Sequence, residues 1–516
     1  MNTDRNAVKK TTLTVLIMTA ATVVAKLLGL IRDVLVAGSY GTGTEAVAYE
    51  TASRLPILLF DFVIGGVVTA AFIPVFSELM EQKGKKDAMR FALDYFNLVF
   101  TATLLLTLIG EIFAPQLVSL LAPDIPAEAA ELAVPLTRIM FPMVIFSGLA
   151  FSFVALLQSF GHFRLPSIIS LFSNGAIVLY LLFFNDRFGV YGLSFALLIG
   201  WMLQALVQLP TALRLGFFWR PTQFLTPEIR RAASAFLPVL LASWLLPAVN
   251  IINTRFASGI ADGRAVTAVG YAYRFYIIIV GVFSFVATNL LFPKLSRVAV
   301  GGDTSAAKRL TASSAKLLLA VVFPVAAGCF ALALPVIRIV FMRGAFTAED
   351  AEMTAEALRW FCLGMPAMAL NEVLQKYFFS RRALHAPMIT SVAACVADYL
   401  FVFFLSDRFG IAGIAGAAGL AILFCAAANF LIDARQSGPL FSGRDAWELC
   451  RCCLFAVLCG MAAYFCYSAL GALPVLAALM ISVLAGVSVY LVLTLLFPFS
   501  ELRSLLKKEA RNENKS

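Results

Sequence analysis

Charged side chains within long apolar runs are the residues of this sequence best suited to chemistry. Lys26, Arg32 and Asp33 lie in or at the end of the first such run, which begins near Thr12. A charge at the centre of a bilayer costs roughly 2.5–3.5 kcal/mol on insertion scales, so these residues almost always face a bundle interior or a water-filled path. Lys26 and Asp33 are seven residues apart and share one helical face, whereas Arg32 is turned from them by about 120°. The pattern predicts a site for a charged ligand.

Three further arginines extend this set of cations. Counted along the chain, Arg54 begins the second apolar run, Arg255 ends the seventh and Arg274 lies inside the eighth. A guanidinium offers planar, permanently charged donors that match the oxygens of a phosphate. An excess of cations facing one cavity therefore predicts an anionic substrate, most simply a phosphate or pyrophosphate. Structural roles remain as alternatives, namely a local ion pair between Arg32 and its neighbour, and interfacial anchoring for Arg54 and Arg255.

Two acids are also embedded in apolar sequence. Asp61 lies within LLFDFVIGG and Asp398 within CVADYLF. Either could bind a proton or Na⁺, or neutralise a neighbouring cation, and the sequence leaves these alternatives open. A proton or Na⁺ gradient could supply the energy for transport, and so could the membrane potential, because one charge crossing 100 mV is worth about 2.3 kcal/mol.

The pattern expected of an enzyme is missing from the sequence. His162 and His385 are the only histidines, and both lie in short basic loops without an acidic cluster. Acid–base or metal chemistry on a phosphate would need such a cluster. Cys450 and Cys453 form a single C-x-x-C without a second pair, which is weak evidence for metal. We therefore predict a transporter without catalytic residues, metal site or cofactor.

The composition predicts the elements that must position these residues. The chain is 61% hydrophobic and 14% charged, whereas a soluble domain is about 45–50% apolar and 25% charged. The sequence predicts an all-α polytopic membrane protein with about fourteen transmembrane helices of roughly 20 residues each. Their approximate ranges are 12–33, 55–80, 91–121, 133–159, 166–185, 189–213, 233–255, 267–292, 312–341, 354–377, 387–406, 411–433, 449–470 and 474–497.

Basic residues in the loops predict the orientation in the membrane. They gather in the N-terminal tail, in the loops after the second, sixth and eighth runs, and in the C-terminal tail, whereas the opposite loops are acidic. The positive-inside rule then places both termini in the cytoplasm, which an even number of spans satisfies. The net charge of +10 is explained by these loops and does not indicate a nucleic-acid partner.

The sequence also repeats itself at an offset near 220 residues. FNDRFGVYGL at 184–193 matches LSDRFGIAGI at 405–414, and SRLPILL at 53–59 matches YRFYIII at 273–279. We predict two six-helix bundles, residues 1–222 and 223–440, followed by two extra helices in 441–500 and a basic tail in 501–516. Because the two halves are offset by six helices, an even number, equivalent helices cross the membrane in the same direction. The repeat is therefore parallel, about an axis near the membrane normal. Two such halves predict a central cavity with alternating access, into which the buried cations converge.

Several of these motifs resemble the MurJ (MviN) family of the multidrug/oligosaccharidyl-lipid/polysaccharide exporter superfamily. They are KLLGLIRD in the first run, SRLP and AFIPVFSE in the second, INTRFAS after the seventh and LLFPKLS after the eighth. The resemblance implies a lipid II flippase that moves undecaprenyl-pyrophosphate-linked disaccharide-pentapeptide to the outer leaflet for peptidoglycan synthesis. It implies cavity roles for Lys26, Arg32, Asp33 and Arg274, and a groove from the last two helices for the polyprenyl tail. Membrane lipids and other cell-wall synthesis proteins are the further implied partners, and the bacterial cytoplasmic membrane is the implied location.

The sequence departs from the family pattern in two helices. Studied members carry a basic pair and an acid inside the second helix, where this chain has Phe60, Asp61 and Gly65, and an acid where it has Ile277. The departures keep two alternatives open, namely an exporter of another polyprenyl-pyrophosphate-linked oligosaccharide and a non-transporting scaffold of the same fold.

Overall fold

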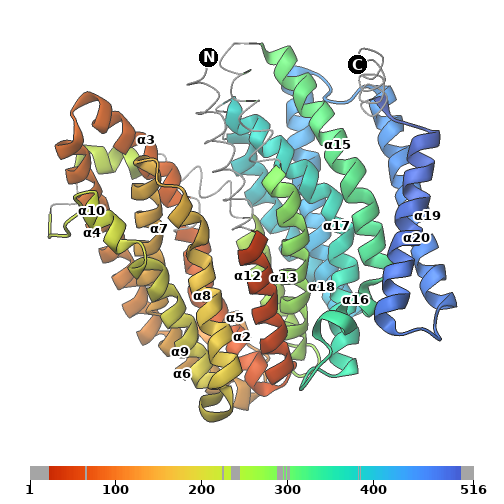
Figure 1. The fold of residues 1–516 in the computed structure, drawn as a ribbon, viewed down its shortest axis with the longest axis horizontal. Helices are drawn as coiled ribbons and strands as arrows, with labels where there is room; N and C mark the ends of the chain where they lie inside the picture. The colour runs from red at the N-terminus through yellow and green to blue at the C-terminus, as the bar shows by residue number, and fades with distance from the viewer. Residues whose placement is uncertain are drawn as a thin grey trace, which may run out of the picture. The chain divides into compact units, whose positions relative to one another are not determined.

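Helices make up the regular structure of the described part of the chain. The computed structural model describes residues 23–63, 67–222, 226–233, 245–286, 295, 298, 303–381, 383 and 385–500, and these contain helices and no strand (Figure 1). Eight helical stretches in this part are long and apolar enough to cross a membrane. The chain is therefore an all-α, multi-pass membrane protein, as predicted. The count of fourteen spans stays a prediction, because the described residues leave gaps within four of the predicted ranges.

The chain divides into two compact units, and the first comprises residues 1–267 together with 343–346. It begins with a helix over residues 23–40. The helices that follow are α2 (Thr44–Val63), α3 (Val67–Gln82), α4 (Lys85–Ile112), α5 (Ala114–Leu121), α6 (Ala127–Met140), α7 (Met143–Ser159), α8 (Arg164–Phe183), α9 (Asn185–Leu206), α10 (Leu209–Arg214) and α12 (Leu245–Ala257).

Aromatic packing involving α3, α4 and α7 forms part of the hydrophobic core of the first unit. Phe72 stacks on Phe76 at 5.2 Å between ring centres, and Phe96 packs against Phe153 at 4.9 Å. Gly110 brings α4 against the ring of Phe141, because a Cβ at position 110 would lie 1.9 Å from the nearest ring carbon. Any side chain there would overlap the ring, so the glycine sets the distance between these helices.

The second unit comprises residues 268–342 and 347–516. Its helices are α13 (Arg264–Val286, which begins in the first unit), α15 (Thr304–Ala331), α16 (Ala333–Phe341), α17 (Ala348–Ser380), α18 (His385–Ser437), α19 (Gly443–Ala469) and α20 (Val475–Leu496). Helices α17 and α18 pack closely at two glycines, since a Cβ on Gly364 would lie 2.9 Å from the Cα of Gly419. The hairpin of α19 and α20 packs mainly on α15.

A shared bend appears in both units. Gly189 interrupts α9 with φ 55° and ψ −148°, and Gly410 interrupts α18 with φ 53° and ψ −128°. The two glycines are 221 residues apart and close the two DRFG motifs of the sequence repeat. Glycine adopts positive φ at no steric cost, so the repeated motif produces the same local bend twice. The predicted boundaries at residues 222 and 440 stay predictions, because compactness is a different criterion from internal homology.

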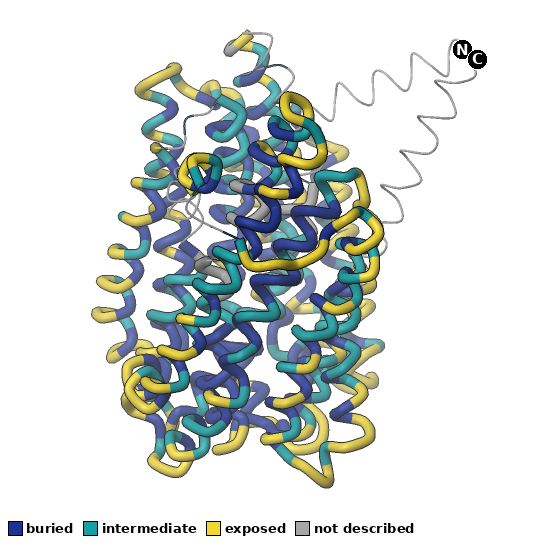
Figure 2. Tube along the Cα trace, turned by 90° about the vertical axis from the view of Figure 1, so that its left-hand side faces the viewer, coloured by how far each residue is buried: buried dark blue, intermediate teal, exposed yellow. Residues whose placement is uncertain are grey.

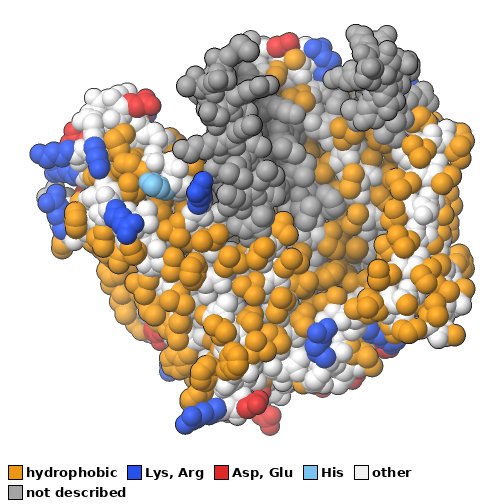
Figure 3. Space-filling model, viewed as in Figure 1, with side chains coloured by type: hydrophobic (Ala, Val, Ile, Leu, Met, Phe, Trp, Pro, Cys, Tyr) orange, Lys and Arg blue, Asp and Glu red, His pale blue; other side chains and the backbone are white. Residues whose placement is uncertain are grey.

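Many large hydrophobic side chains are exposed on the surfaces of the helices. Buried and exposed positions alternate along many of the helices (Figure 2). Helix α20 exposes Leu484, Leu495 and Leu496 by more than 60% each. Hydrophobic side chains cover most of the visible face in Figure 3, and charged ones gather toward the helix ends. The exposed apolar surface is what a bilayer would cover.

Candidate functional site

The first helix carries a hydrogen-bonded pair of opposite charges. Arg32 donates from Nε and Nη2 to Oδ1 of Asp33, at 3.0 and 2.8 Å. Its Nη1 donates at 3.0 Å to Oδ1 of Asn174 on α8, which fixes the remaining edge of the guanidinium. Asp33 is buried, whereas the side chain of Arg32 is 29% exposed. Three of the five N–H groups of Arg32 are thus engaged, and the other two are available to an anion.

Lys26 lies almost two turns before Arg32 on the same helix. Its side chain is half-buried, and among the described residues it has no ion-pair partner. The Nδ2 of Asn174 lies 3.4 Å from the carbonyl of Ala25, so α8 contacts the helix at both levels. Lys26 therefore has no acidic partner in the part of the chain that the structure describes.

Arg54 is more tightly held than the sequence predicts. It is buried on α2, and its Nε and Nη2 donate to Oε1 of Glu50, one turn earlier, at 3.1 and 2.7 Å. Its Nη1 donates to Oδ1 of Asn250 on α12. Glu50 is itself buried. An incoming anion would have to compete with this carboxylate, so Arg54 contributes less free positive charge than its type implies.

Arg255 and Arg274 occupy different settings. Arg255 is exposed at the end of α12, and its Nη1 donates at 2.6 Å to the carbonyl of Leu120 at the end of α5. This bond satisfies a carbonyl that a helix end leaves unpaired. Arg274 belongs to the second unit, where its guanidinium carbon lies 5.6 Å from the centre of the Tyr271 ring. Its convergence with the cations of the first unit stays a prediction of the repeat.

The two embedded acids differ in how far the structure describes them. Asp61 lies on α2, but its side chain and that of Phe60 are not described, and Gly65 lies outside the described residues. Asp398 on α18 is fully buried, and neither carboxylate oxygen has a hydrogen-bond partner among the described residues. A buried carboxylate without a partner is costly, which makes Asp398 a candidate for binding a proton or a cation.

Several polar residues of the site were not predicted. Asn174, Asn250 and Glu50 complete the coordination of Arg32 and Arg54, although each is unremarkable in the sequence. Asn371 is buried on α17, and its Oδ1 accepts at 2.9 Å from Nδ2 of Asn429. An asparagine inside an apolar run was the available signal, since polar side chains between membrane helices pair with one another.

An apolar groove lies in the second unit. It measures about 650 Å³ and is lined by residues of α15, α17, α18 and α19, including Phe323, Phe330, Leu363, Leu423 and Tyr464. The resemblance predicts a groove from the last two helices. The observed groove uses α19, with no α20 residue among its lining, and its walls are almost wholly apolar.

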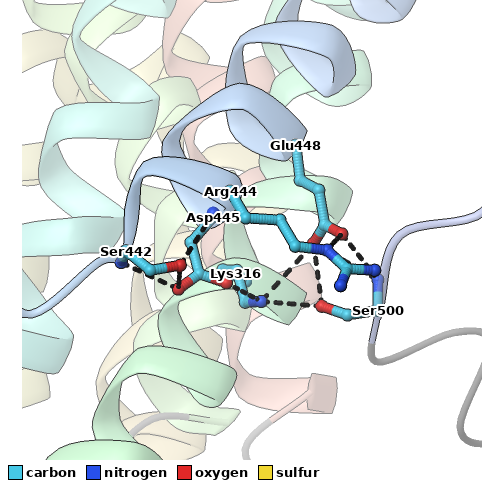
Figure 4. Close-up of polar contacts among 6 residues, drawn as sticks. All are labelled: Lys316, Ser442, Arg444, Asp445, Glu448 and Ser500. Atoms are coloured by element: carbon cyan, nitrogen blue, oxygen red, sulfur yellow. Dashed lines mark hydrogen bonds and ion pairs between the residues drawn. The ribbon is translucent and has the colours of Figure 1, made fainter.

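A buried polar cluster holds α19 on α15 at one end of this hairpin (Figure 4). Lys316 of α15 is 5% exposed, and its ammonium contacts the carboxylate of Asp445, lies 3.5 Å from that of Glu448 and donates at 2.9 Å to Oγ of Ser500. Ser500 in turn donates from its backbone N–H and its hydroxyl to Glu448. We call Lys316, Asp445, Glu448 and Ser500 the α15–α19 latch. It joins three separate segments of the second unit.

Comparison with known proteins places these features in context. The family model described as lipid II flippase MurJ matches residues 36–498. The probable lipid II flippase MurJ of Rhizobium meliloti is 32% identical over 398 residues, which cover 74% of each chain. The lipid II flippase MurJ of Burkholderia cenocepacia is 27% identical over 403 residues, covering 76% of this chain and 78% of that one.

Solved structures show the same fold at lower identity. A lipid II flippase MurJ in an inward closed conformation aligns with a TM-score of 0.81 and 21% identity, covering 95% of this chain and all of that one. An inward-facing multidrug resistance MATE family transporter of the MOP superfamily aligns with a TM-score of 0.67 and 13% identity, covering 82% of this chain and 97% of that one.

Proposed function

Because the chain belongs to the MurJ family, we propose that it is a transporter that moves lipid II from the inner to the outer leaflet of the bacterial cytoplasmic membrane. The match of the family model over residues 36–498 is the observation that carries this proposal. The multi-pass helical fold supports it, since charged side chains on membrane helices could line a path for a polar headgroup across the bilayer. In this proposal both termini lie in the cytoplasm, as the distribution of basic loops predicts.

The pyrophosphate of the lipid II headgroup would bind to the cationic side chains that the membrane helices carry. Lys26 lacks an acidic partner among the described residues, and Arg32 has two N–H groups to spare, so these two are the primary anion ligands of the first unit. Asp33 positions Arg32. Arg54 and Arg255 play secondary roles, because Glu50 and a helix-end carbonyl already engage them. Arg274, held against Tyr271, supplies the cation of the second unit.

Ion coupling is assigned to the embedded acids. Asp398 is buried and has no hydrogen-bond partner in the described part of the chain, so taking up a proton or a monovalent cation would relieve the cost of its burial. Asp61 is the matching candidate in the first unit. Each conformational cycle would then be driven by the ion gradient or the membrane potential.

A related cargo is the second candidate function. The helix-two cations of studied family members are replaced here at Phe60 and Gly65, and Arg54 at the head of that helix is paired with Glu50. This departure from the family pattern keeps two alternatives in view, another polyprenyl-pyrophosphate-linked oligosaccharide as cargo and a scaffold that recruits cell-wall synthesis proteins; a weaker anion site fits the scaffold, and it does not distinguish two cargoes that share a pyrophosphate.

Complementation tests the proposal. A bacterium depleted of its own lipid II flippase is supplied with this chain, and growth is scored beside the variants Arg32→Ala and Arg274→Ala at equal expression. We expect rescue by the unmodified chain and loss of rescue in both variants. Rescue that survives both changes would show that the arginines are structural. Failure of the unmodified chain, once it is shown in the membrane, would favour the related cargo or the scaffold.

A further inference from the structure

The segment after α10 is fastened to α4 by a buried aromatic side chain. Phe217 is 1% exposed, and its ring centre lies 4.4 Å from that of Phe96 and 5.7 Å from that of Phe153. These contacts fix the backbone of residues 214–222, which we call the connector. The connector therefore has a defined position in the first unit and is no loose linker.

Asn97 of α4 clamps the connector at a particular depth. Its Nδ2 donates to the carbonyl of Arg220 and to Oγ1 of Thr222, both at 2.9 Å, and its Oδ1 accepts from Nε1 of Trp219 at 3.0 Å. Before Asn97 the sequence of α4 mixes apolar residues with charged ones, the last of them Asp94, and after it LVFTATLLLTLIG carries no charge. The clamp thus lies where the charges of α4 end and its uncharged stretch begins, which is the level expected for the membrane interface.

Two aromatic side chains are exposed at this level. Phe218 is 66% exposed and Trp219 is 43% exposed, although Trp219 also packs edge-on against Phe100 at 5.1 Å. Amphipathic aromatic rings concentrate at the headgroup level of membranes. Their exposure, next to the backbone that Asn97 holds, is what a segment resting in the interface would show.

Basic residues outnumber acidic ones at this end of the first unit, where Glu78, Glu81, Asp87, Asp94 and Glu228 are the acids. Two basic residues of this end of the unit are paired, Lys83 with Glu228 at 3.4 Å and Arg231 with Glu78 at 2.8 Å. Seven others have no ion pair among the described residues: Lys85, Lys86, Arg90, Arg164, Arg214, Arg220 and Arg230. Lys and Arg side chains gather beside hydrophobic ones at this end in Figure 3.

We propose that the connector is a docking element for anionic phospholipids of the cytoplasmic leaflet. Phe218 and Trp219 insert among the headgroups, and Arg214 and Arg220 bind their phosphates. The basic loops predict that this end is cytoplasmic, where anionic lipids attract juxtamembrane basic segments. The inference is independent of the substrate that the chain transports.

The combination of features selects a lipid over other anions. A free phosphate would use the cations but gain nothing from exposed rings at bilayer depth. An acidic soluble protein would not reach side chains that lie among headgroups. Only a ligand that is apolar and anionic at once satisfies both sets of residues.

The first test measures the depth of Trp219. The other four tryptophans, Trp201, Trp244, Trp360 and Trp447, are replaced by Phe in the full-length chain, which is then placed in lipid nanodiscs. We expect phospholipids brominated near the headgroup end of their chains to quench the emission more strongly than soluble acrylamide. Stronger quenching by acrylamide would overturn the proposal and indicate a surface open to a soluble partner.

The second test uses the chain with its native tryptophans. Nanodiscs with increasing phosphatidylglycerol content are dissociated in a mass spectrometer, and the phosphatidylglycerol retained on the protein is counted. Each basic residue near an anionic surface strengthens attraction about fivefold, so Arg214→Gln with Arg220→Gln should weaken retention about 30-fold at low salt.

The matched control is Arg187→Gln with Arg408→Gln. Both arginines are exposed and adjacent to exposed phenylalanines, but they lie in the two DRFG bends at the predicted outer side. We expect this control to retain the lipid fully, and inorganic phosphate to leave the retained lipid in place. Equal losses in both double variants, or displacement by inorganic phosphate, would overturn the proposal.

Discussion

The α15–α19 latch yields a quantitative prediction. Replacing Lys316 by Met leaves Asp445 and Glu448 without their shared cation; Glu448, whose side chain is only 7% exposed, keeps only the exposed Arg444 at 3.5 Å. Removing one partner of a buried ion pair typically costs 3–5 kcal/mol. Asp445 is 21% exposed and partly solvated, which moves the expected cost to the lower end, about 3 kcal/mol. That cost favours separation of α19 from α15 by about 150-fold.

Cys452 provides the readout of this separation. It is 5% exposed and packs with Ala320 of α15 and Phe499, next to the latch. In a chain whose other eight cysteines are replaced by Ala, a maleimide reacts with Cys452 only when the helices part. The labelling rate in detergent should rise about 150-fold in Lys316→Met, because the rate follows the population of the parted state.

Two further variants decide whether the latch is responsible. Lys376→Met is the matched control, since Lys376 is half-buried, lies 5.8 Å from the Phe379 ring centre and has no ion pair among the described residues. It should leave the labelling rate unchanged. Adding Asp445→Asn and Glu448→Gln to Lys316→Met should restore most of the protection, because no buried charge then lacks its partner and Arg444, which loses Glu448, is exposed. A rate that changes less than about threefold in Lys316→Met would refute the reasoning.

Three further predictions concern the helices that carry the site. Gly110→Ala should destabilise the first unit by about 1–3 kcal/mol through overpacking, seen as a lower unfolding temperature in detergent. Gly175→Ala should not, because a Cβ there meets nothing within 4 Å. Arg54→Gln should destabilise the first unit by about 3–5 kcal/mol, because it removes the Arg54 guanidinium from the buried Glu50 carboxylate. The double variant with Glu50→Gln should recover much of that stability. Equal losses of stability in the single and double variants would show that the charge pair is not the cause. Asp398→Asn should preserve the unfolding temperature and abolish the dependence of transport on the coupling ion, whereas retained dependence would exclude Asp398 from coupling.

The all-helical membrane fold could be predicted because lipid allows few solutions. Backbone groups must pair within each spanning segment, so apolar length and composition predict helices directly. The repeated DRFG motif predicted equivalent positions in the two halves, and Gly189 and Gly410 adopt the same positive-φ bend. The groove from the last two helices stays a prediction. The observed groove has α19 against α15, an arrangement that depends on small residues such as Gly460, which approaches Ala327 closely.

The polar partners of the site could not be predicted from spacing. Sequence patterns identify that Arg32 and Arg54 are inside apolar runs, but not which distant helix supplies Asn174 or Asn250. Those contacts depend on helix rotation and packing, which local sequence does not encode. The pairing of Asn371 with Asn429 depends on the same packing, since α17 continues to Ser380 and buries Asn371.

Direct observation of lipid II at the outer face tests the central proposal most sharply. In cells depleted of their own flippase, an externally added hydrolase that cannot cross the membrane is used to cleave lipid II exposed on the outer leaflet. With this chain expressed, newly made lipid II should become cleavable, and with Arg32→Ala it should stay protected inside. Lipid II that remains protected while the unmodified chain is present in the membrane would contradict lipid II transport by this protein.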